Sequence, residues 1–256
     1  MRMQTHEGRE GLFAVMLIAL LCVFCSHARA QATTTLPPDA SDLATRVAQT
    51  LCRLDDSTKV LYARRFYGDI ALVPDDSCGA TTREALRVLI PQLNTIMRGG
   101  ATLRMQAHAV PSASSITVYV GAQGAQRAHA AGWDFATSGN TGYYTQLHMP
   151  DGRIERAAIW LANDVVLYDT TRATPESASY STLLQELSQA LGPGYDAPTP
   201  WHSEIPAWCD GSRATTLSLS ETFTLALLYR ELRGGETETE VRAAVLRVLS
   251  IVALRP

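Results

Sequence analysis

Apolar positions follow a two-residue period in the middle of the chain and a 3.6-residue period near its end. Ile116, Val118 and Val120 occupy every second position, which is the pattern of a half-buried strand. Apolar composition and flanking turn residues predict further strands. These cover residues 68–73, 101–110, 142–149 and 154–161. The pattern therefore predicts that the first two thirds of the chain build a sheet.

A helix is predicted between the first two strands. Its apolar residues recur at helical spacing, Thr81 or Thr82 is a good N-cap, and Gly99-Gly100 is a good stop signal. Pro91 lies inside this segment and should kink the helix or split it in two. Residues 121–142, in contrast, are rich in Gly, Ala, Ser and Asn and are expected to form a long surface excursion.

The last third of the chain is expected to be helical. Thr174-Pro175-Glu176 combines an N-cap, a proline at the first helical position and an acid, and predicts a helix over 175–191. Capping boxes at Ser218-x-x-Glu221 and Thr237-x-x-Glu240 predict two more helices. The order of elements is strand, helix, several strands and then helices, which indicates an α+β domain.

The N-terminus has the features of a secretory signal peptide. Arg2 and Arg9 precede an apolar run, Leu12 to Phe24, of about thirteen residues, and a membrane span needs about twenty. Ala28-x-Ala30 is a small-x-small cleavage pattern, so we expect the mature chain to begin at Gln31. A retained N-terminal anchor and a lipoprotein are the alternatives.

Removal of the signal peptide, residues 1–30, leaves a chain that can bury a core of its own. Residues 31–58 are expected to form a flexible leader with a short helix, and residues 59–256 a single domain. The net charge changes from −3 to −4, because the signal holds three arginines and two glutamates. A mildly acidic chain without a basic cluster is not expected to bind nucleic acid or an anionic membrane. We expect the protein in the periplasm or outside the cell, with no membrane span after cleavage.

Three cysteines remain after cleavage, an odd number for an oxidising compartment. Cys52 and Cys78 close the shorter loop and flank an early strand, so we predict a disulfide between them. Cys209 would then be a free thiol. For this residue a role as a small buried hydrophobe is favoured over one as nucleophile or metal ligand.

The predicted helix over 175–191 has an apolar face and a polar face. Its polar face holds Ser181, Gln185, Glu186, Ser188 and Gln189. Taken alone, this is an amphipathic helix with a solvated polar side. The run from Leu184 to Asp196, Leu-Gln-Glu-Leu-Ser-Gln-Ala-Leu-Gly-Pro-Gly-Tyr-Asp, resembles the zinc helix of the metzincin metallopeptidases, whose pattern is H-E-x-x-H-x-x-G-x-x-H. Glu186 and Gly192 stand at the Glu and Gly positions of that pattern.

A second similarity lies downstream of this helix. Leu217 to Glu221, followed by Leu225 to Tyr229, resembles the start and the Leu-Tyr end of the closing helix in matrixin-type members. The resemblance covers roughly residues 60–233 and is closest to exported bacterial zincin-like proteins of unknown function that have Gln in place of zinc-binding His. It implies a zincin-like fold: a mixed, twisted sheet with a backing helix, an active-site-type helix and C-terminal helices.

The three histidine positions of the metzincin pattern hold Gln185, Gln189 and Tyr195. A neutral carboxamide is a poor ligand for zinc, whose catalytic sites use three protein ligands, mostly imidazole nitrogens. No Met-turn methionine follows, since Ile205-Pro206 stands about where it is expected. We therefore expect no metal and no cofactor. Glu186 is the one residue that retains a catalytic role in the pattern, as general base, and only if the chain is active.

The resemblance places the polar residues of the helix in one cleft. Gln185, Glu186 and Gln189 are expected to project into it, with Tyr195 and the loop 201–205 across from them. His202 lies in that loop and is the histidine expected to face the cleft. The other mature histidines, His108, His129 and His148, are dispersed and lack metal-ligand spacing.

Two functions from different classes follow. The first is an exported, non-enzymatic protein whose former active-site cleft binds a peptide or protein segment as an added strand, which needs no metal. The alternative is a metal-dependent hydrolase or peptidase with a rebuilt site that draws on Glu186, Gln189, Asp196 and His202, and only this alternative uses zinc. A purely structural role is a third possibility.

Overall fold

The structure of the protein is a computed structural model that describes residues 40–52, 62–108, 114–135, 140–165, 178–193, 206–208 and 214–253. The predicted signal peptide and the cleavage site before Gln31 lie outside the described residues. So do four residues of the predicted chemistry, Tyr195, Asp196, His202 and Cys209.

A mixed sheet of five strands forms the centre of the fold, in the order β2-β1-β3-β5-β4. The strands are β1 (Gly68–Pro74), β2 (Ala101–Met105), β3 (Ser115–Val120), β4 (Gly142–His148) and β5 (Ile154–Leu161). Neighbouring strands are parallel except β4, which is antiparallel to β5 and forms one edge of the sheet. The predicted strands and the α+β class are therefore confirmed, except that the strand expected over 101–110 ends at Met105.

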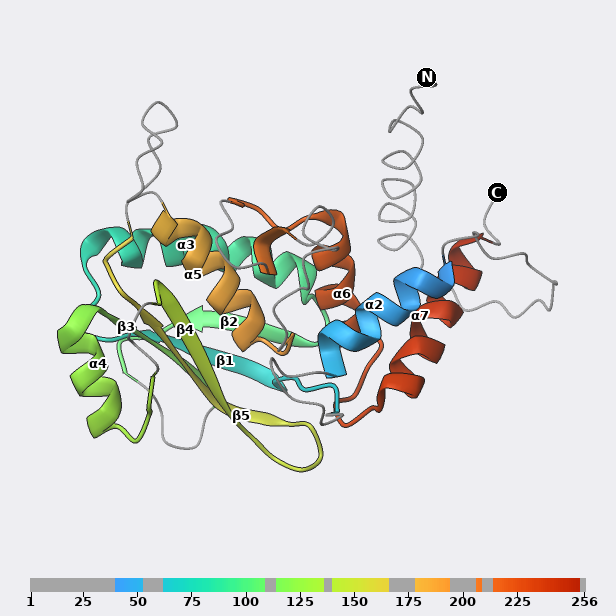
Figure 1. Cartoon of the computed structure of the whole chain (residues 1–256), viewed down its shortest axis with the longest axis horizontal. Coiled ribbons are helices and arrows are strands. Elements are labelled where there is room, and N and C mark those ends of the chain that lie inside the picture. Colours follow the sequence, from blue (N-terminus) through green and yellow to red (C-terminus); the bar gives the residue numbers. More distant parts are fainter. Residues whose placement is uncertain are drawn as a thin grey trace, which may run out of the picture.

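Helices cover this sheet on both faces and extend past one end of it (Figure 1). They are α2 (Ala40–Cys52), α3 (Ala80–Ile96), α4 (Gly121–Ala130), α5 (Ala178–Ala190), α6 (Leu219–Arg230) and α7 (Glu238–Ala253), with a 3-10 turn η3 (Pro206–Trp208). Helices α3 and α5 lie over one face, and α2, α6 and α7 gather beyond one end of the sheet (Figure 1). None of the helices in the described ranges is long and apolar enough to cross a membrane.

Alternation along each strand separates two apolar cores. On β5, Ile159 and Leu161 join the main core beneath α3 and α5, whereas Ala158 and Trp160 point to the other face and pack with Ala128 of α4. The main core also includes α2, whose apolar side packs against α7. The short helix expected within residues 31–58 is therefore confirmed, and it contributes to the main core.

The expected surface excursion was wrong over its first part. Residues 121–130 form helix α4. Alanine has the highest helix propensity, and the segment holds four alanines besides its two glycines, so composition alone misled. Helix α3 continues through Pro91, so one of the two expected effects of this proline, a split into two helices, is not found. Pro91 is exposed, so the carbonyl four residues earlier, which loses its partner, can bind water.

The N-terminus of α3 is capped by a residue distant in sequence. Its N-cap is Gly79, which has no side chain, and not Thr81 or Thr82. Asp164 lies 85 residues later and accepts a hydrogen bond from the Gly79 N–H at 3.2 Å. The hydroxyls of Thr81 and Thr82 donate to the same carboxylate. This cap joins the start of α3 to the segment that follows β5, and it places a negative charge where the helix dipole favours one.

The predicted disulfide between Cys52 and Cys78 is not formed, and both thiols are free and buried. Cys52 Sγ donates to the Glu236 carbonyl, which also accepts from the N–H of Ala63, a residue that precedes β1. Cys78 Sγ donates to Val118 O, which lies beside the end of β1. The seven residues of β1 span about 23 Å, far more than the about 6 Å between the Cα atoms of a disulfide. Loop length in the sequence gave no measure of this separation.

We expect Cys52 and Cys78 to be alkylated separately when the non-reduced protein is unfolded in iodoacetamide. In the native protein at pH 8 both should react slowly, because burial raises the pKa of each thiol to about 12 and keeps it protonated. Peptide mapping by mass spectrometry measures both results. A peptide pair linked through Cys52 and Cys78 would contradict the structure.

Candidate functional site

Helix α5, which carries the predicted site residues, is buried on all sides. It packs on β4 and β5, on η3 and on α3. Its polar residues are Ser181, Thr182, Gln185, Glu186, Ser188 and Gln189, and each is at most 8% exposed. The polar face of α5 is therefore not solvated, in contrast to the polar face of an isolated amphipathic helix. It faces protein, and its polar groups have to be satisfied within the fold.

Glu186 lies against the start of the edge strand β4. A Cβ built on Gly142 would lie 3.0 Å from Glu186 Oε1 and 2.3 Å from Thr182 Cγ2. Gly142 thus allows α5 to approach the backbone of β4 more closely than any side chain would. The expectation that Glu186 belongs to a helix packed on the sheet is met, and Glu186 is 7% exposed.

Gly142→Ala should lower the free energy of unfolding by about 1–3 kcal/mol, because the added methyl group overpacks the contact with α5. Thr182→Ser removes the methyl group that lies closest and keeps the hydroxyl. In the Gly142→Ala background it should recover part of the loss, which a double-mutant cycle from urea denaturation measures. Strict additivity of the two changes would show that α5 does not lie on β4 as described.

The other end of α5 is also joined to β4. Gln146 Nε2 donates to the carbonyls of Gln189 and Ala190 at 3.1 and 3.0 Å, and so satisfies two acceptors of the last helical turn. Gly142 and Gln146 are four residues apart and share one face of the strand. The strand β4 therefore follows α5 along most of its length.

A buried hydrogen-bond network lies beneath α5. Trp208 of η3 is fully buried and donates its indole N–H to Ser188 Oγ at 2.7 Å. Glu221, at the start of α6, accepts from the backbone N–H groups of Ala207 and Trp208 at 2.6 and 3.1 Å. The predicted capping box of Ser218 and Glu221 is present, and the Glu221 carboxylate also holds η3 beneath α5. Burial raises the pKa of Glu221, while its hydrogen bonds act in the opposite direction.

The turn after α5 is held from α6. Tyr229, in the Leu-Tyr end of that helix, donates its hydroxyl to Leu191 O at 2.7 Å. Burial raises the pKa of this phenol, so it stays a donor. Gly192 follows with a φ of 143°, and a Cβ there would lie 2.2 Å from Arg64 O. A glycine is therefore required where this turn meets the segment before β1.

Arg65 was not identified from the sequence, although it caps the end of α6. Its side chain is 7% exposed and lies about 5 Å from the ring centres of Tyr67 and Tyr229. Its guanidinium donates to five backbone carbonyls, those of Phe66, Gly100, Leu228, Tyr229 and Leu232. No local sequence signal marks this arginine, since its acceptors lie more than 30 residues away in all cases but one.

The structure brings together three of the predicted site residues, Gln185, Glu186 and Gln189, on the buried polar face of α5. Their expected neighbours Tyr195 and His202 lie outside the described residues. Among the described residues, no group of three or more His, Cys, Asp or Glu side chains lies together as a metal site would require. Gln185 and Gln189 offer only neutral amide groups at the two helix positions where the metzincin pattern has histidines, so these residues do not fit zinc.

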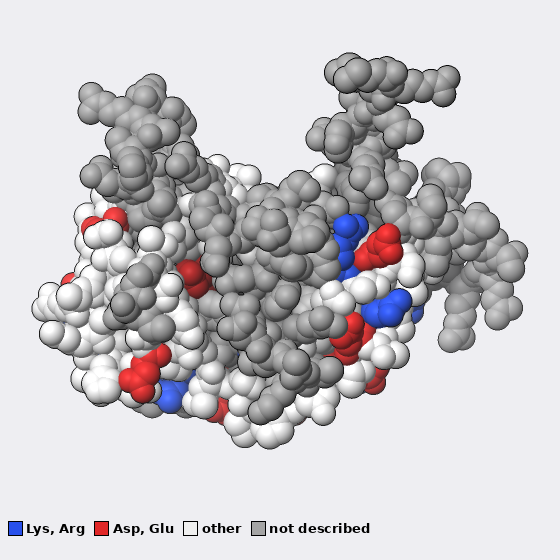
Figure 2. Space-filling model, in the orientation of Figure 1, with Lys and Arg blue, Asp and Glu red and all other residues white. Residues whose placement is uncertain are grey.

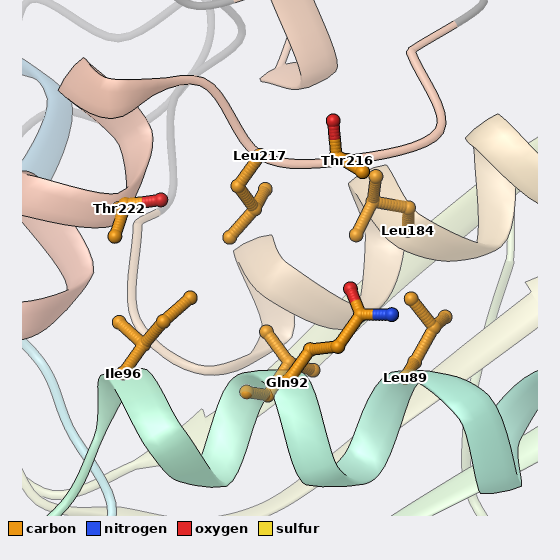
Figure 3. Close-up of a pocket in the computed structure, with 8 residues that line it drawn as sticks. Leu89, Gln92, Ile96, Leu184, Thr216, Leu217 and Thr222 are labelled. Atoms are coloured by element: carbon orange, nitrogen blue, oxygen red, sulfur yellow. The ribbon is translucent and has the colours of Figure 1, made fainter.

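A cavity of about 210 Å³ lies on the opposite side of α5, between α3 and the start of α6 (Figure 3). It is lined by Leu89, Gln92, Leu93, Ile96, Leu184, Thr216, Leu217 and Thr222. Leu184 and Glu186 are two residues apart and so point about 200° from each other around the helix. None of the lining residues is titratable. The cavity is therefore separate from the predicted chemistry.

Charged side chains of the described residues are scattered and mixed in sign on the face shown in Figure 2. Arg127 lies between Asp75 and Asp76, with ion-pair distances of 2.9 and 3.0 Å. The pair with Asp76 is exposed and contributes little to stability, whereas the Asp75 side chain is only 12% exposed. No extended surface of one sign is visible over the described residues on that face.

Comparisons of the chain with protein-family models, with curated proteins and with solved structures find no match.

Proposed function

We propose that this chain is an exported binding protein with a zincin-like arrangement of strands and helices, which holds a peptide or protein segment as an added strand on the outer edge of β4. The edge strand supports this proposal most directly. β4 ends the sheet order, and its register with β5 is regular from Gly142 to Leu147, with a shift only at His148. Alternate N–H and C=O groups of such a strand point away from its neighbour.

The composition of β4 is unusual for an edge. Natural edge strands carry charges or proline that prevent pairing with other chains. The seven residues of β4 are Gly-Tyr-Tyr-Thr-Gln-Leu-His, without Asp, Glu, Lys, Arg or Pro. The opposite edge, β2, has Arg104, whose side chain is 64% exposed and pairs with Asp69. The β4 edge therefore lacks the protection that β2 has, as expected of a strand that accepts a partner.

Helix α5 supports the same edge from one face of the sheet. Its contacts at Gly142 and Gln146 hold β4 in position, so that the added strand would meet a rigid template. On the other face of β4, Tyr143 and Leu147 are 39% and 42% exposed and are available to contact side chains of the bound segment. Main-chain hydrogen bonds would supply affinity, and these side chains selectivity.

Peptides selected from a random library against the mature protein test the proposal. Two N-methylated versions of each peptide are compared, one methylated at the odd residues and one at the even residues. One version should lose binding and the other should keep it, because only one set of N–H groups faces β4. Leu147→Lys should weaken binding at least tenfold, while Val88→Lys, at an exposed position of α3, should leave it unchanged. Equal losses of binding for the two N-methylated versions would rule out strand addition.

The alternative is a hydrolase with a rebuilt site. It is favoured by the burial of Glu186 beside Gly142, at the strand that would hold the substrate. Elemental analysis of the purified protein and a Glu186→Ala variant assayed on peptide libraries separate the two functions. Zinc at one ion per chain, or turnover lost in that variant, would establish the hydrolase. A binding protein should show neither, and its stability should not change when chelator is added.

A further inference from the structure

Arg64 is a buried cation without a counterion in the described part of the chain. Its side chain is 3% exposed, and its Nε and Nη2 atoms are buried without a hydrogen-bond partner. The next residue, Arg65, is buried to a similar extent but satisfies its guanidinium with five carbonyls. Two adjacent arginines thus have opposite environments, and only Arg65 has the partners that a capping role requires.

The groups around Arg64 do not neutralise it. Tyr144 and Cys52 act on it electrostatically, and the pKa of Cys52 is raised to about 12 by burial, so its thiol carries no charge at neutral pH. Glu236 and Glu238 act on Cys52 but not on Arg64. The pKa of His148 is lowered mainly by burial and to a smaller extent by the positive charge of Arg64. Among the residues that the structure describes, no carboxylate acts on this arginine.

Two buried guanidinium nitrogens without acceptors are costly, because they have lost water without gaining hydrogen bonds. Buried arginines in folded proteins are paired almost without exception. Burial lowers the pKa of Arg64, but a guanidinium in a protein keeps its proton at neutral pH, so the cost of the buried charge remains. The planar fork of a guanidinium is suited to two parallel hydrogen bonds from its nitrogens to a carboxylate.

The position of Arg64 links it to the β4 edge. Tyr144, Gln146 and His148 alternate on the face of β4 that carries the Gln146 contact with α5. Tyr144 packs on the main core and His148 is exposed, so this row runs from the interior to the surface. Both of these side chains interact electrostatically with Arg64. The Arg64 carbonyl packs against Gly192, directly after α5.

We infer that Arg64 binds a carboxylate of the segment held at β4, either a free C-terminus or an Asp or Glu side chain. This inference rests on the proposed function and names the chemistry of its ligand. Because the guanidinium is already shielded from water, a carboxylate that reaches it forms charge-assisted hydrogen bonds with little competition from solvent. The bound segment would then be recognised by its backbone along β4 and by its negative charge at Arg64.

Thermal unfolding of the mature protein in sodium acetate and in sodium chloride of equal ionic strength tests the anion site without any peptide. The wild-type Tm should be higher in acetate, and Arg64→Met should remove the difference. Arg104→Met, on the exposed edge β2, should keep it. In chloride, Arg64→Met should be at least as stable as the wild type, because the buried unpaired charge is gone. A fall in Tm of more than about 4 °C in chloride would assign Arg64 a structural role and overturn the inference.

A second experiment measures the binding of peptides selected against the mature protein. Amidation of the peptide C-terminus identifies a terminal carboxylate, and Asp→Asn or Glu→Gln changes identify a side chain. One of these should weaken binding at least tenfold for the wild type and have no effect on Arg64→Met. Peptides that bind without any dependence on carboxylates would overturn the inference and leave strand addition intact. An acetate response that depends on Arg64, without peptide binding, would support the anion site and reject the proposed function.

Discussion

Replacement of Glu221 by alanine is expected to lower the free energy of unfolding by about 3–5 kcal/mol. The Glu221 side chain is fully buried, and its two oxygens accept hydrogen bonds from the backbone N–H groups of Ala207, Trp208 and Ser218. Alanine would leave all three donors without an acceptor in the interior, and it would release η3 from beneath α5. Guanidinium denaturation measures the change.

Two variants separate the buried role of Glu221 from simple helix capping. Glu240 occupies the corresponding position of the capping box of α7 and accepts from the Thr237 N–H at 2.8 Å, but it is exposed. Glu240→Ala should therefore cause a much smaller loss than Glu221→Ala. Ser218→Ala removes only the other half of the buried box and should cost about 1 kcal/mol. Equal losses for the two glutamates would mean that the contacts with η3 contribute nothing.

Arg65→Met is expected to lower the free energy of unfolding by about 3–4 kcal/mol. Its guanidinium satisfies the carbonyls of Leu228, Tyr229 and Leu232 at the end of α6 and that of Gly100 before β2. Methionine fills much of the space but donates no hydrogen bond, so these buried acceptors would lose their partner. The loss should appear in guanidinium denaturation as a lower midpoint with an unchanged slope.

The neighbouring arginine is the matched control for Arg65. Arg64→Met makes the same chemical change one residue earlier, at a side chain that is 3% exposed against 7% for Arg65. Because Arg64 has two unsatisfied nitrogens, this change should be neutral or stabilising. The two variants are therefore expected to change the free energy of unfolding in different directions: Arg65→Met should lower it, and Arg64→Met should leave it unchanged or raise it. A similar loss for both would show that burial of an arginine, and not its hydrogen bonding, decides the outcome.

Local signals were sufficient wherever an element depends on residues within a few positions of one another. The alternation at 115–120 fixed a strand, and the Ser218 and Thr237 capping boxes located the starts of α6 and α7. Each of these depends on the backbone period or on a hydrogen bond spanning three residues. The wrong prediction at α4 also has a local cause, the high helix propensity of alanine, and α3 continues through Pro91 because this proline is exposed.

The candidate site could be predicted only in part. The sequence identified Gln185, Glu186 and Gln189 as one face of a helix, and they do share the buried face toward β4. It did not predict that this face is buried, because burial depends on β4, which lies about 40 residues earlier. No local sequence pattern pointed to Arg64, Arg65 or Asp164, because their roles depend on groups from other segments of the chain.

The cysteines illustrate the same limit. Their number and spacing favoured a disulfide, but β1 runs between Cys52 and Cys78 and holds them apart. The sequence by itself therefore determined the strands, most of the helices, the capping boxes of α6 and α7 and the α+β class, because these depend on short-range periodicity and local hydrogen bonds. Only the tertiary structure decided which thiols meet, which polar face is buried and which arginine is satisfied. Those outcomes depend on contacts between segments that are distant along the chain, and such contacts leave no fixed spacing in the sequence.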